Sequence, residues 1–490
     1  MRRSTGRAAG WQLRSVVTLA TALLAAILIA AGGSFIGAQS ATFDPGRIPL
    51  VGRTRSVCTV PDGDEGTASD QRRTEIGAVV MRKAPGREGR LDGGPLTGDE
   101  KLFTLDEQGT GELLRKPAAS VLLSGEGVMA TASAGSVITT AASGDDQGIS
   151  VAPCTAPAVD HWFVGVGHSD QQQSTLILTN VDETQAEVDL RFFGAKGMII
   201  VPGSPGMIVP GRSSVTVGLA SLVDAQGPLT VSVHATKGRV AAISRDQRSV
   251  GDEPAGADWH PSAISPRRQV VVPGLPSGAG GRELLVVNPG DRRAVVKVEV
   301  LGAGGSYAPI GAETVDVAPE STASVDLADA LGGEAAGLRL SSDQPVTATV
   351  QSTSSRSGAS SDLAFEVADP PVIRSGIAAA AILDGAASTL QLANNGPSEV
   401  TVSFDVVSYA GRILRQDDVP MAAGSSDTRV LTQTPPAYLV VRTPEGADVH
   451  ASVTQEQNEG DVAGLTTPSL VSPDLASRAP QVRQDPAAGR

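Results

Sequence analysis

The chain has 490 residues and a net charge of −14, an acidity that argues against binding to nucleic acid or to anionic lipid. Only 3% of its residues are aromatic, so Val, Ala and Leu must fill the cores, which favours narrow β-sandwiches over deep pockets lined by aromatic rings. The length predicts three or four domains.

The N-terminus carries a predicted membrane anchor. Residues 16–36 are almost wholly apolar, and about 20 such residues cross a bilayer core. The only charges before this segment are four Arg residues, which predicts a cytoplasmic N-terminus and an external bulk. We therefore expect residues 1–42 to be a cytoplasmic tip and a transmembrane helix. The alternative is a signal peptide cleaved near residues 38–40, which would leave a secreted protein.

Residues 43–157 read as an irregular β region, with long loops rich in Gly, Asp and Arg. Cys58 and Cys154 are the two cysteines of the chain and flank this region. Two cysteines in an exported protein are usually paired, so we predict a disulfide that closes the region. Neither has a second Cys or a His at the spacing of a metal site.

A repeat dominates the rest of the chain. Apolar strands end at Asn180, Asn288 and Asn394, which stand 108 and 106 residues apart (288 − 180 and 394 − 288), and a Gly follows each Asn 17 residues later. This period is the size of one β-sandwich. We predict an all-β chain of tandem immunoglobulin-like sandwiches, in a row, at residues 158–257, 266–370 and 372–457, with a disordered tail at 458–490.

Each repeat is predicted to contain seven strands. The Asn and the following Gly are typical of turns, since both tolerate positive φ and Asn bonds its own backbone. A third strand alternates apolar and polar residues, as in Glu187–Phe192, which indicates one buried face. A closing hairpin ends each repeat. A similar hairpin at residues 119–132 indicates that the N-terminal region is a fourth, degenerate module.

The sequence contains no catalytic, cofactor-binding or metal-binding motif that we recognise. The one stretch that concentrates reactive side chains is Cys154–His168, where the first repeat begins. As a function, Asp160, His161 and His168 would hold a metal or line a site together with Trp162. As structure, Trp162 would cap the sandwich core and pack near the disulfide. We favour the structural interpretation and keep the four residues as site candidates.

Several of these features together resemble a known family. They are the Arg-flanked apolar segment, the Cys before the first repeat, the stretch C-x-x-P-x-x-x-H-W-F-V-G at Cys154–Gly165, and the Leu-x-Leu-x-Asn strands. The chain is similar to the actinobacterial domain of unknown function 5719 over most of residues 43–457. This resemblance implies an envelope protein with no assigned activity. It also implies genes next to large membrane glycosyltransferases, and so a link to envelope glycan assembly.

We therefore expect a non-enzymatic scaffold or binding protein of the cell envelope, tethered by one membrane-spanning helix with its bulk outside. Its partner would be another envelope protein, such as a membrane glycosyltransferase, or a cell-wall polysaccharide, with no nucleic acid and no cofactor. One alternative is an extracytoplasmic hydrolase with a site near residues 154–168. A second is a secreted carbohydrate-binding protein, which the small number of aromatic residues disfavours.

Overall fold

The computed structural model describes residues 52–60, 72–82, 88–223, 227–431, 435–459 and 461–472. These residues form mostly β-strands in antiparallel sheets. The predicted membrane anchor and most of the predicted tail lie outside the described residues. Among the helices that are described, none has the length and apolar character needed to span a bilayer.

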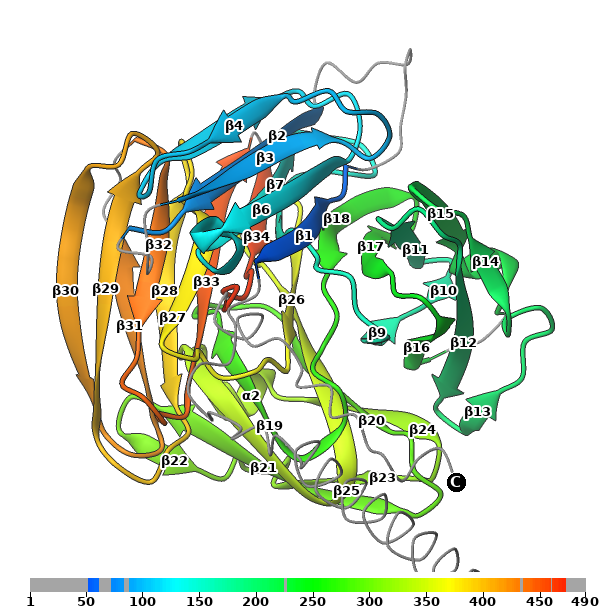
Figure 1. Cartoon of the computed structure of the whole chain (residues 1–490). Coiled ribbons are helices and arrows are strands. Elements are labelled where there is room, and N and C mark those ends of the chain that lie inside the picture. Colours follow the sequence, from blue (N-terminus) through cyan, green and yellow to red (C-terminus); the bar gives the residue numbers. More distant parts are fainter. Residues whose placement is uncertain are drawn as a thin grey trace, which may run out of the picture. The chain divides into compact units, whose positions relative to one another are not determined.

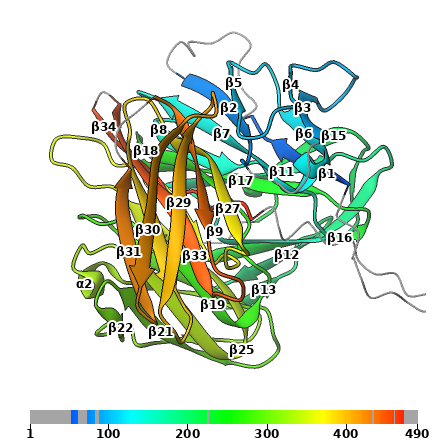
Figure 2. The ribbon, with the colours of Figure 1, turned by 60° about the vertical axis from the view of Figure 1, so that its left-hand side comes forward.

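The strands form four modules, which follow one another from blue to red in Figures 1 and 2. The N-terminal module contains β1 (Arg53–Cys58), β2 (Arg72–Val80), β3 (Gly89–Pro95), β4 (Phe103–Leu105), β5 (Gly111–Arg115), β6 (Val121–Gly127), the 3-10 turn η2 (Val128–Thr131), β7 (Ser133–Ala141) and β8 (Gly148–Pro153). The first repeat contains β9 (Asp160–Val166), β10 (His168–Ser169), β11 (Gln172–Asn180), β12 (Ala186–Gly194), β13 (Gly197–Ile199), β14 (Met207–Val209), β15 (Ser213–Gly218), η3 (Leu219–Ser221), β16 (Leu229–Lys237), β17 (Ala241–Val250) and β18 (Glu253–His260).

The second repeat contains β19 (Arg267–Leu275), β20 (Arg282–Asn288), β21 (Ala294–Gly302), β22 (Gly305–Tyr307), β23 (Thr314–Val317), β24 (Ser321–Asp326), the short helix α2 (Ala328–Leu331), β25 (Ala336–Thr353) and β26 (Leu363–Val367). The third repeat contains β27 (Ser375–Ile382), β28 (Ala387–Asn394), β29 (Val400–Ser408), β30 (Ile413–Met421), β31 (Ser425–Leu431), β32 (Ala437–Arg442), β33 (Val449–Glu459) and β34 (Val462–Thr466).

All four modules share one strand order. One sheet has the orders β1-β6-β3-β4, β9-β16-β12-β13, β19-β25-β21-β22 and β27-β32-β29-β30 in the successive modules. The facing sheet has the orders β5-β2-β7-β8, β15-β11-β17-β18, β24-β20-β25-β26 and β31-β28-β33-β34. The N-terminal region is therefore a complete fourth module and not an irregular one. The order also differs from the predicted immunoglobulin order, because the first strand of each module does not pair with the second.

The predicted closing hairpin is wrong as a strand pairing. In the first repeat β16 pairs with β9 and β12, whereas β17 pairs with β11 and β18 in the other sheet. Each of the two strands is therefore bonded along both edges, so neither has an edge left for the other. In the second repeat the same segment is one long strand, β25, which passes from one sheet to the other.

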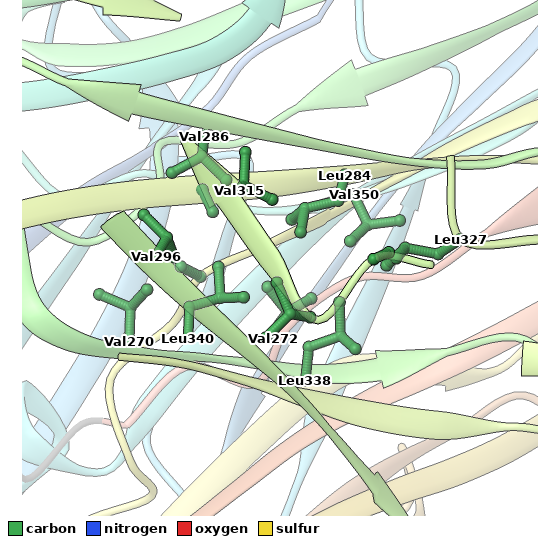
Figure 3. Packing of buried hydrophobic residues seen from close by; sticks show 14 of the residues in the cluster. Val270, Val272, Leu284, Val286, Val296, Val315, Leu327, Leu338, Leu340 and Val350 are labelled. Carbon is green, nitrogen blue, oxygen red and sulfur yellow. The ribbon is translucent and has the colours of Figure 1, made fainter. Parts of the chain in front are cut away.

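Aliphatic side chains fill the space between the two sheets of each repeat. In the second repeat, Val296, Leu338 and Leu340 from one sheet meet Leu284, Val286 and Val350 from the other (Figure 3). The alternating third strand places Val296, Val298 and Val300 in this core, as predicted from the sequence. Removing this apolar surface from water is the main contribution to the stability of each sandwich.

The repeated Asn residues close one end of each sandwich in the same way. The Nδ2 of Asn288 donates hydrogen bonds to the carbonyl oxygens of Arg292 (2.6 Å) and Ala318 (3.1 Å), and its Oδ1 accepts one from the N–H of Gly290 (3.1 Å). Asn180 and Asn394 make the equivalent bonds, and all three side chains are buried. Turn chemistry is thereby confirmed as the role of the repeated Asn.

We expect Asn288→Ala to lower the free energy of unfolding by about 2 to 4 kcal/mol, because it leaves buried backbone groups without partners. Asn288→Asp should cost more, since a carboxylate faces carbonyl oxygens that need a donor. Urea unfolding of the two variants measures this order. Gln171→Ala, at an exposed position, is the matched control. Equal stability of the Ala and Asp variants would contradict the assignment of the donated bonds.

The last strand of each module was not predicted. β26 lies inside the predicted second repeat, β18 runs past the predicted end of the first repeat at residue 257, and β34 lies in the predicted disordered tail, so the last two boundaries are corrected. β18 and β34 each contact both β8 and β26 where the four modules come together; β18, β26 and β34 are labelled in Figure 1. Their polar residues are buried against neighbouring modules, a burial that the polar and apolar pattern of one strand does not reveal.

The modules contact one another in a closed cycle and not in a simple row. The N-terminal module and the first repeat share the cluster around Cys58, Cys154 and Trp259, and the first and second repeats share one around Phe193 and Leu285. Smaller clusters join the second repeat to the third and the third back to the N-terminal module. All described residues accordingly belong to one compact unit.

The carboxylate of Asp362 accepts hydrogen bonds from all four modules. The Oδ2 of Asp362 accepts hydrogen bonds from the N–H groups of Ile149 (2.9 Å) and Leu465 (3.0 Å). Its Oδ1 accepts from Ala257 (3.3 Å) and from Leu363 (2.9 Å). The four donors come from β8, β34, β18 and β26, one strand of each module. Asp362 is fully buried, so these bonds hold the centre of the assembly without solvent.

Candidate functional site

Two of the four candidate residues lie on the outer face of a sheet in the first repeat. The register of β9, β16 and β12 aligns Asp160 with His234 and Asp189, and Trp162 with Ser232 and Arg191. A third row consists of Val164, Thr230 and Phe193. Because alternate residues of a strand point to one face, these nine side chains share the face turned away from the core of the first repeat.

The second repeat covers the third row. Val164 and Phe193 pack on Leu285 and Val287, and the hydroxyl of Thr322 lies 2.8 Å from both the Phe193 carbonyl oxygen and the Thr230 hydroxyl. The rings of Trp162 and Phe193 stack with centroids 5.8 Å apart. Trp162 therefore stands at the border between the module contact and solvent.

The second repeat does not cover the rows that contain Asp160 and Trp162. Side chains of these two rows line a groove of about 270 Å³ at the border of the two repeats. The groove is lined by Asp160, Trp162, Arg191, Phe193, Met198, Ser232 and His234 of the first repeat and by Pro289 and Glu320 of the second. The Asp160 carboxylate accepts a hydrogen bond from the Nδ1 of His234 at 2.7 Å. Both side chains are about half exposed (51% and 45%), so a ligand can reach the pair.

The remaining candidates do not join this groove. His161 is buried on the core side of β9, where its Nε2 lies 2.8 Å from the carbonyl oxygen of Val240, and burial lowers its pKa. His168 lies in β10 and pairs with Gln173. Since Asp160, His161 and His168 are apart, the metal interpretation finds no support. Among the described residues, no three His, Cys, Asp or Glu side chains are placed to bind one ion.

The disulfide between Cys58 and Cys154 is present. The Trp that packs in its cluster is Trp259 of β18 and not Trp162, which corrects the sequence interpretation. The ring of Trp259 is almost fully buried, with the guanidinium of Arg245 5.2 Å from its centre. The disulfide thus lies at the contact between the N-terminal module and the first repeat.

A second cleft, of about 440 Å³, lies between the N-terminal module and the third repeat. Its charged lining mixes Arg73, Arg115 and Lys116 with Glu75 and Asp384, and Arg115 pairs with Glu75 at 3.3 Å. Its aromatic residue, Tyr409, is tied by a hydrogen bond from its hydroxyl to the Ala379 carbonyl oxygen. We rank this cleft second, because it contains neither of the candidates that the sequence singled out.

The acids with the most perturbed pKa values lie at the buried centre and not in either cleft. Burial raises the pKa of Asp362 to about 7, against the effect of its four N–H donors, and the pKa of Glu366 to about 8. A raised carboxyl pKa is often a mark of catalysis. Here both groups are closed off from solvent between modules, so we assign them to structure.

Glu366 should make stability depend on pH. Its Oε2 accepts a hydrogen bond from Ser352 at 2.8 Å, whereas Oε1 has no partner among the described residues. Its folded pKa lies above the ordinary value of 4.5, so the unfolded chain loses its proton first and stability falls as pH rises toward 8. Relative to wild type, Glu366→Gln should therefore gain about 2 kcal/mol between pH 6 and pH 8.

Urea unfolding of both proteins at several pH values measures this difference. Comparison with the variant cancels the titration of other groups, such as His260, whose pKa burial lowers to about 3. A stability difference that stays constant over this range would contradict a protonated Glu366.

Sequence reasoning missed most of the groove. Arg191 was visible only as an exposed position of an alternating strand, and His234 as part of the predicted hairpin. Glu320 lies in the turn before β24 of another module. The register between strands and the contact between repeats bring these residues to Trp162. Neither follows from spacing along the chain.

Comparison with known proteins identifies the family. A family model described as a family of unknown function, DUF5719, matches residues 115–432. The chain belongs to the DUF5719 family. The resemblance seen in the sequence is thereby confirmed. No curated protein sequence matches the chain.

Solved structures resemble the DUF5719 chain only weakly. Thermotoga maritima 1070 matches with 17% identity over 21% of this chain and 95% of its own (TM-score 0.18). An anti-sigma factor domain-containing protein from Clostridium clariflavum matches with 7% identity over 75% and 94% (TM-score 0.12). A Streptomyces avermitilis α-L-rhamnosidase complexed with L-rhamnose matches with 10% identity over 84% and 57% (TM-score 0.13). Scores this low carry no argument about fold or function.

Proposed function

We propose that this protein is a non-catalytic scaffold or binding protein of the cell envelope, anchored by its N-terminal apolar segment with its bulk outside the cytoplasmic membrane. The disulfide supports an oxidising compartment. The four Arg residues before the apolar segment support the orientation. Its partner would be an envelope protein, such as a membrane glycosyltransferase, or a cell-wall polysaccharide.

The observation that carries this proposal is the closed centre of the four modules. Asp362 and the strands around it fill the place where the modules meet, so the middle of the assembly is buried contact and not an enclosed site. In such a chain, the surfaces that a ligand can reach are the outer faces of the modules and the grooves between them. We expect surfaces of this kind to bind a partner protein or a polysaccharide.

A topology test and a binding test examine the proposal together. A reporter active only outside the cytoplasm, fused after residue 490, should be active, and cross-linking in intact membranes should join the chain to a membrane glycosyltransferase. A reporter active only in the cytoplasm would overturn the localisation. Failure to cross-link, with no binding to purified cell-wall polysaccharide, would overturn the scaffold role.

The hydrolase remains the second candidate, because one groove holds the Asp160–His234 pair and the carboxylate of Glu320. A carboxylate that orients an imidazole is a common arrangement for general base catalysis. If the chain is a hydrolase, incubation with envelope polysaccharide releases new reducing ends, and Asp160→Asn abolishes the release. Binding without release favours the scaffold.

A further inference from the structure

Two of the charged side chains that line the groove between the first and second repeats are those of Arg191 and Glu320. Neither takes part in a hydrogen bond or an ion pair with another described residue. Arg191 comes from β12 of the first repeat, and Glu320 from the turn before β24 of the second. Both line the same groove as the ring of Trp162. Polar groups that converge beside an aromatic ring are typical of a ligand site.

The ring at the floor of the groove, that of Trp162, packs against the contact between the two repeats. The indole of Trp162 is held by stacking on Phe193, and Phe193 is fixed by Leu285 and by the Thr322 hydroxyl at its carbonyl oxygen. The backbone N–H of Trp162 also donates to the hydroxyl of Ser262 at 2.9 Å. A ring fixed in this way loses little freedom when a ligand stacks on it, which favours binding.

Both hydrogen-bond donors and acceptors line the groove with the indole of Trp162. The guanidinium of Arg191 is a hydrogen-bond donor, and the carboxylate of Glu320 is an acceptor. Since the Nδ1 of His234 donates to Asp160, a neutral imidazole has its Nε2 available as an acceptor. A ligand that matches this set presents both O–H donors and oxygen acceptors, together with an apolar face for the indole. A sugar ring has these properties.

The charge of the lining and the volume of the groove restrict the class of ligand further. The lining sets Arg191 and His234 against the carboxylates of Asp160 and Glu320, so it has no excess of positive charge to attract a phosphate or a uronic acid. Its volume of about 270 Å³ is below the range of about 300 to 1,000 Å³ typical of small-molecule pockets. The groove therefore suits one sugar residue of a longer chain.

We propose that this groove binds one neutral sugar residue of a glycan, stacked on Trp162, with its hydroxyls held by Arg191, Glu320 and the Asp160–His234 pair. The inference rests on the proposed function, since an external location gives the groove access to envelope glycans. It adds the ligand class and the residues that would recognise it.

The test titrates the full-length protein with neutral galacto-, arabino- and manno-oligosaccharides. Binding is read by calorimetry and by tryptophan fluorescence. Trp162→Phe keeps an aromatic ring on Phe193 and should lose the fluorescence change. Of the other two tryptophans, Trp259 is 1% exposed and out of reach of a ligand, and Trp11 precedes the predicted membrane anchor. A fluorescence change that persists in this variant would place the binding elsewhere and overturn the proposal.

Two variants test the polar contacts without disturbing the module contact. Arg191→Ala and Glu320→Gln should each weaken binding by about tenfold or more, as expected for the loss of a charged hydrogen bond. Arg212→Ala, in the same repeat but outside the groove, is the matched control and should bind like wild type. Circular dichroism of the three variants checks that each is folded.

Several results would contradict the proposed sugar-binding site. Unchanged affinity in both groove variants would do so, as would binding of uronic acid oligosaccharides alone, or of a peptide or protein partner alone at this groove. Release of reducing ends would assign the groove to the hydrolase. An external reporter combined with no saccharide binding would remove this site and leave the location of the scaffold intact, so the two proposals fail separately.

Discussion

At pH 8, above the pKa of about 7 to which burial raises Asp362, Asp362→Asn is expected to lower the free energy of unfolding by about 3 to 6 kcal/mol. The substitution turns one carboxylate oxygen into an NH₂ group, which faces two backbone N–H donors where an acceptor is required. Ile149 and Leu465, or Ala257 and Leu363, then lose their partner in a buried site. We expect the substitution to destabilise the contacts among all four modules, because each module supplies one of the four N–H donors.

Equilibrium unfolding in urea measures this loss. Asp252→Asn, at an exposed position between β17 and β18, is the matched control and should leave the midpoint unchanged. Gly148→Ala should be destabilising for a related reason, since a Cβ there would collide with the Asp362 carboxylate and φ is +116°. An Asp362→Asn protein as stable as the control would show that the four bonds contribute nothing net.

Removing the disulfide should cost about 4 to 5 kcal/mol, because the bond between Cys58 and Cys154 closes a loop spanning 96 residues and restricts the unfolded chain. Its sulfur atoms lie in a cluster with Trp259, so the double variant Cys58→Ala/Cys154→Ala also loses packing between the N-terminal module and the first repeat. We expect the urea midpoint of the double variant to lie well below that of the oxidised wild type.

A reducing agent gives an independent measurement of the same quantity. It should lower the stability of the wild type nearly to that of the double variant and should not change the variant. A wild type whose stability is unaffected by complete reduction of the bond, checked by thiol labelling, would contradict the expected contribution.

The features predicted well from the sequence are those that depend on neighbours in the chain. Asn180, Asn288 and Asn394 bond to groups two and four residues away, so their spacing reveals their role. The third strand follows the same logic, since alternation of apolar and polar residues is local. The family resemblance also rests on such local stretches.

The missed features depend on partners far along the chain. The end of β18, beyond the predicted limit of the first repeat at residue 257, was missed because its residues are mixed in polarity, but Asp258 and Trp259 are buried at contacts with other modules. The N-terminal module lacks the repeated Asn and yet has the strand order of the repeats. Of the groove residues, Asp160 and Trp162 were predicted as candidates because they lie in the stretch Cys154–His168, which concentrates reactive side chains. Arg191 and Glu320 were not predicted, because they lie outside that stretch.

The sequence by itself determined the β-strand composition, the period of the repeats, the Asn turns, the pairing of the two cysteines and the family. These follow from local hydrogen bonding, from side-chain alternation and from the presence of only two thiols. Only the tertiary structure decided the strand order, the closed cycle of four modules, the role of Asp362 and the composition of the groove. The physical reason is that these depend on contacts between residues far apart in the chain, such as Asp160 with His234 and Asp362 with Ile149, which strand periodicity does not encode.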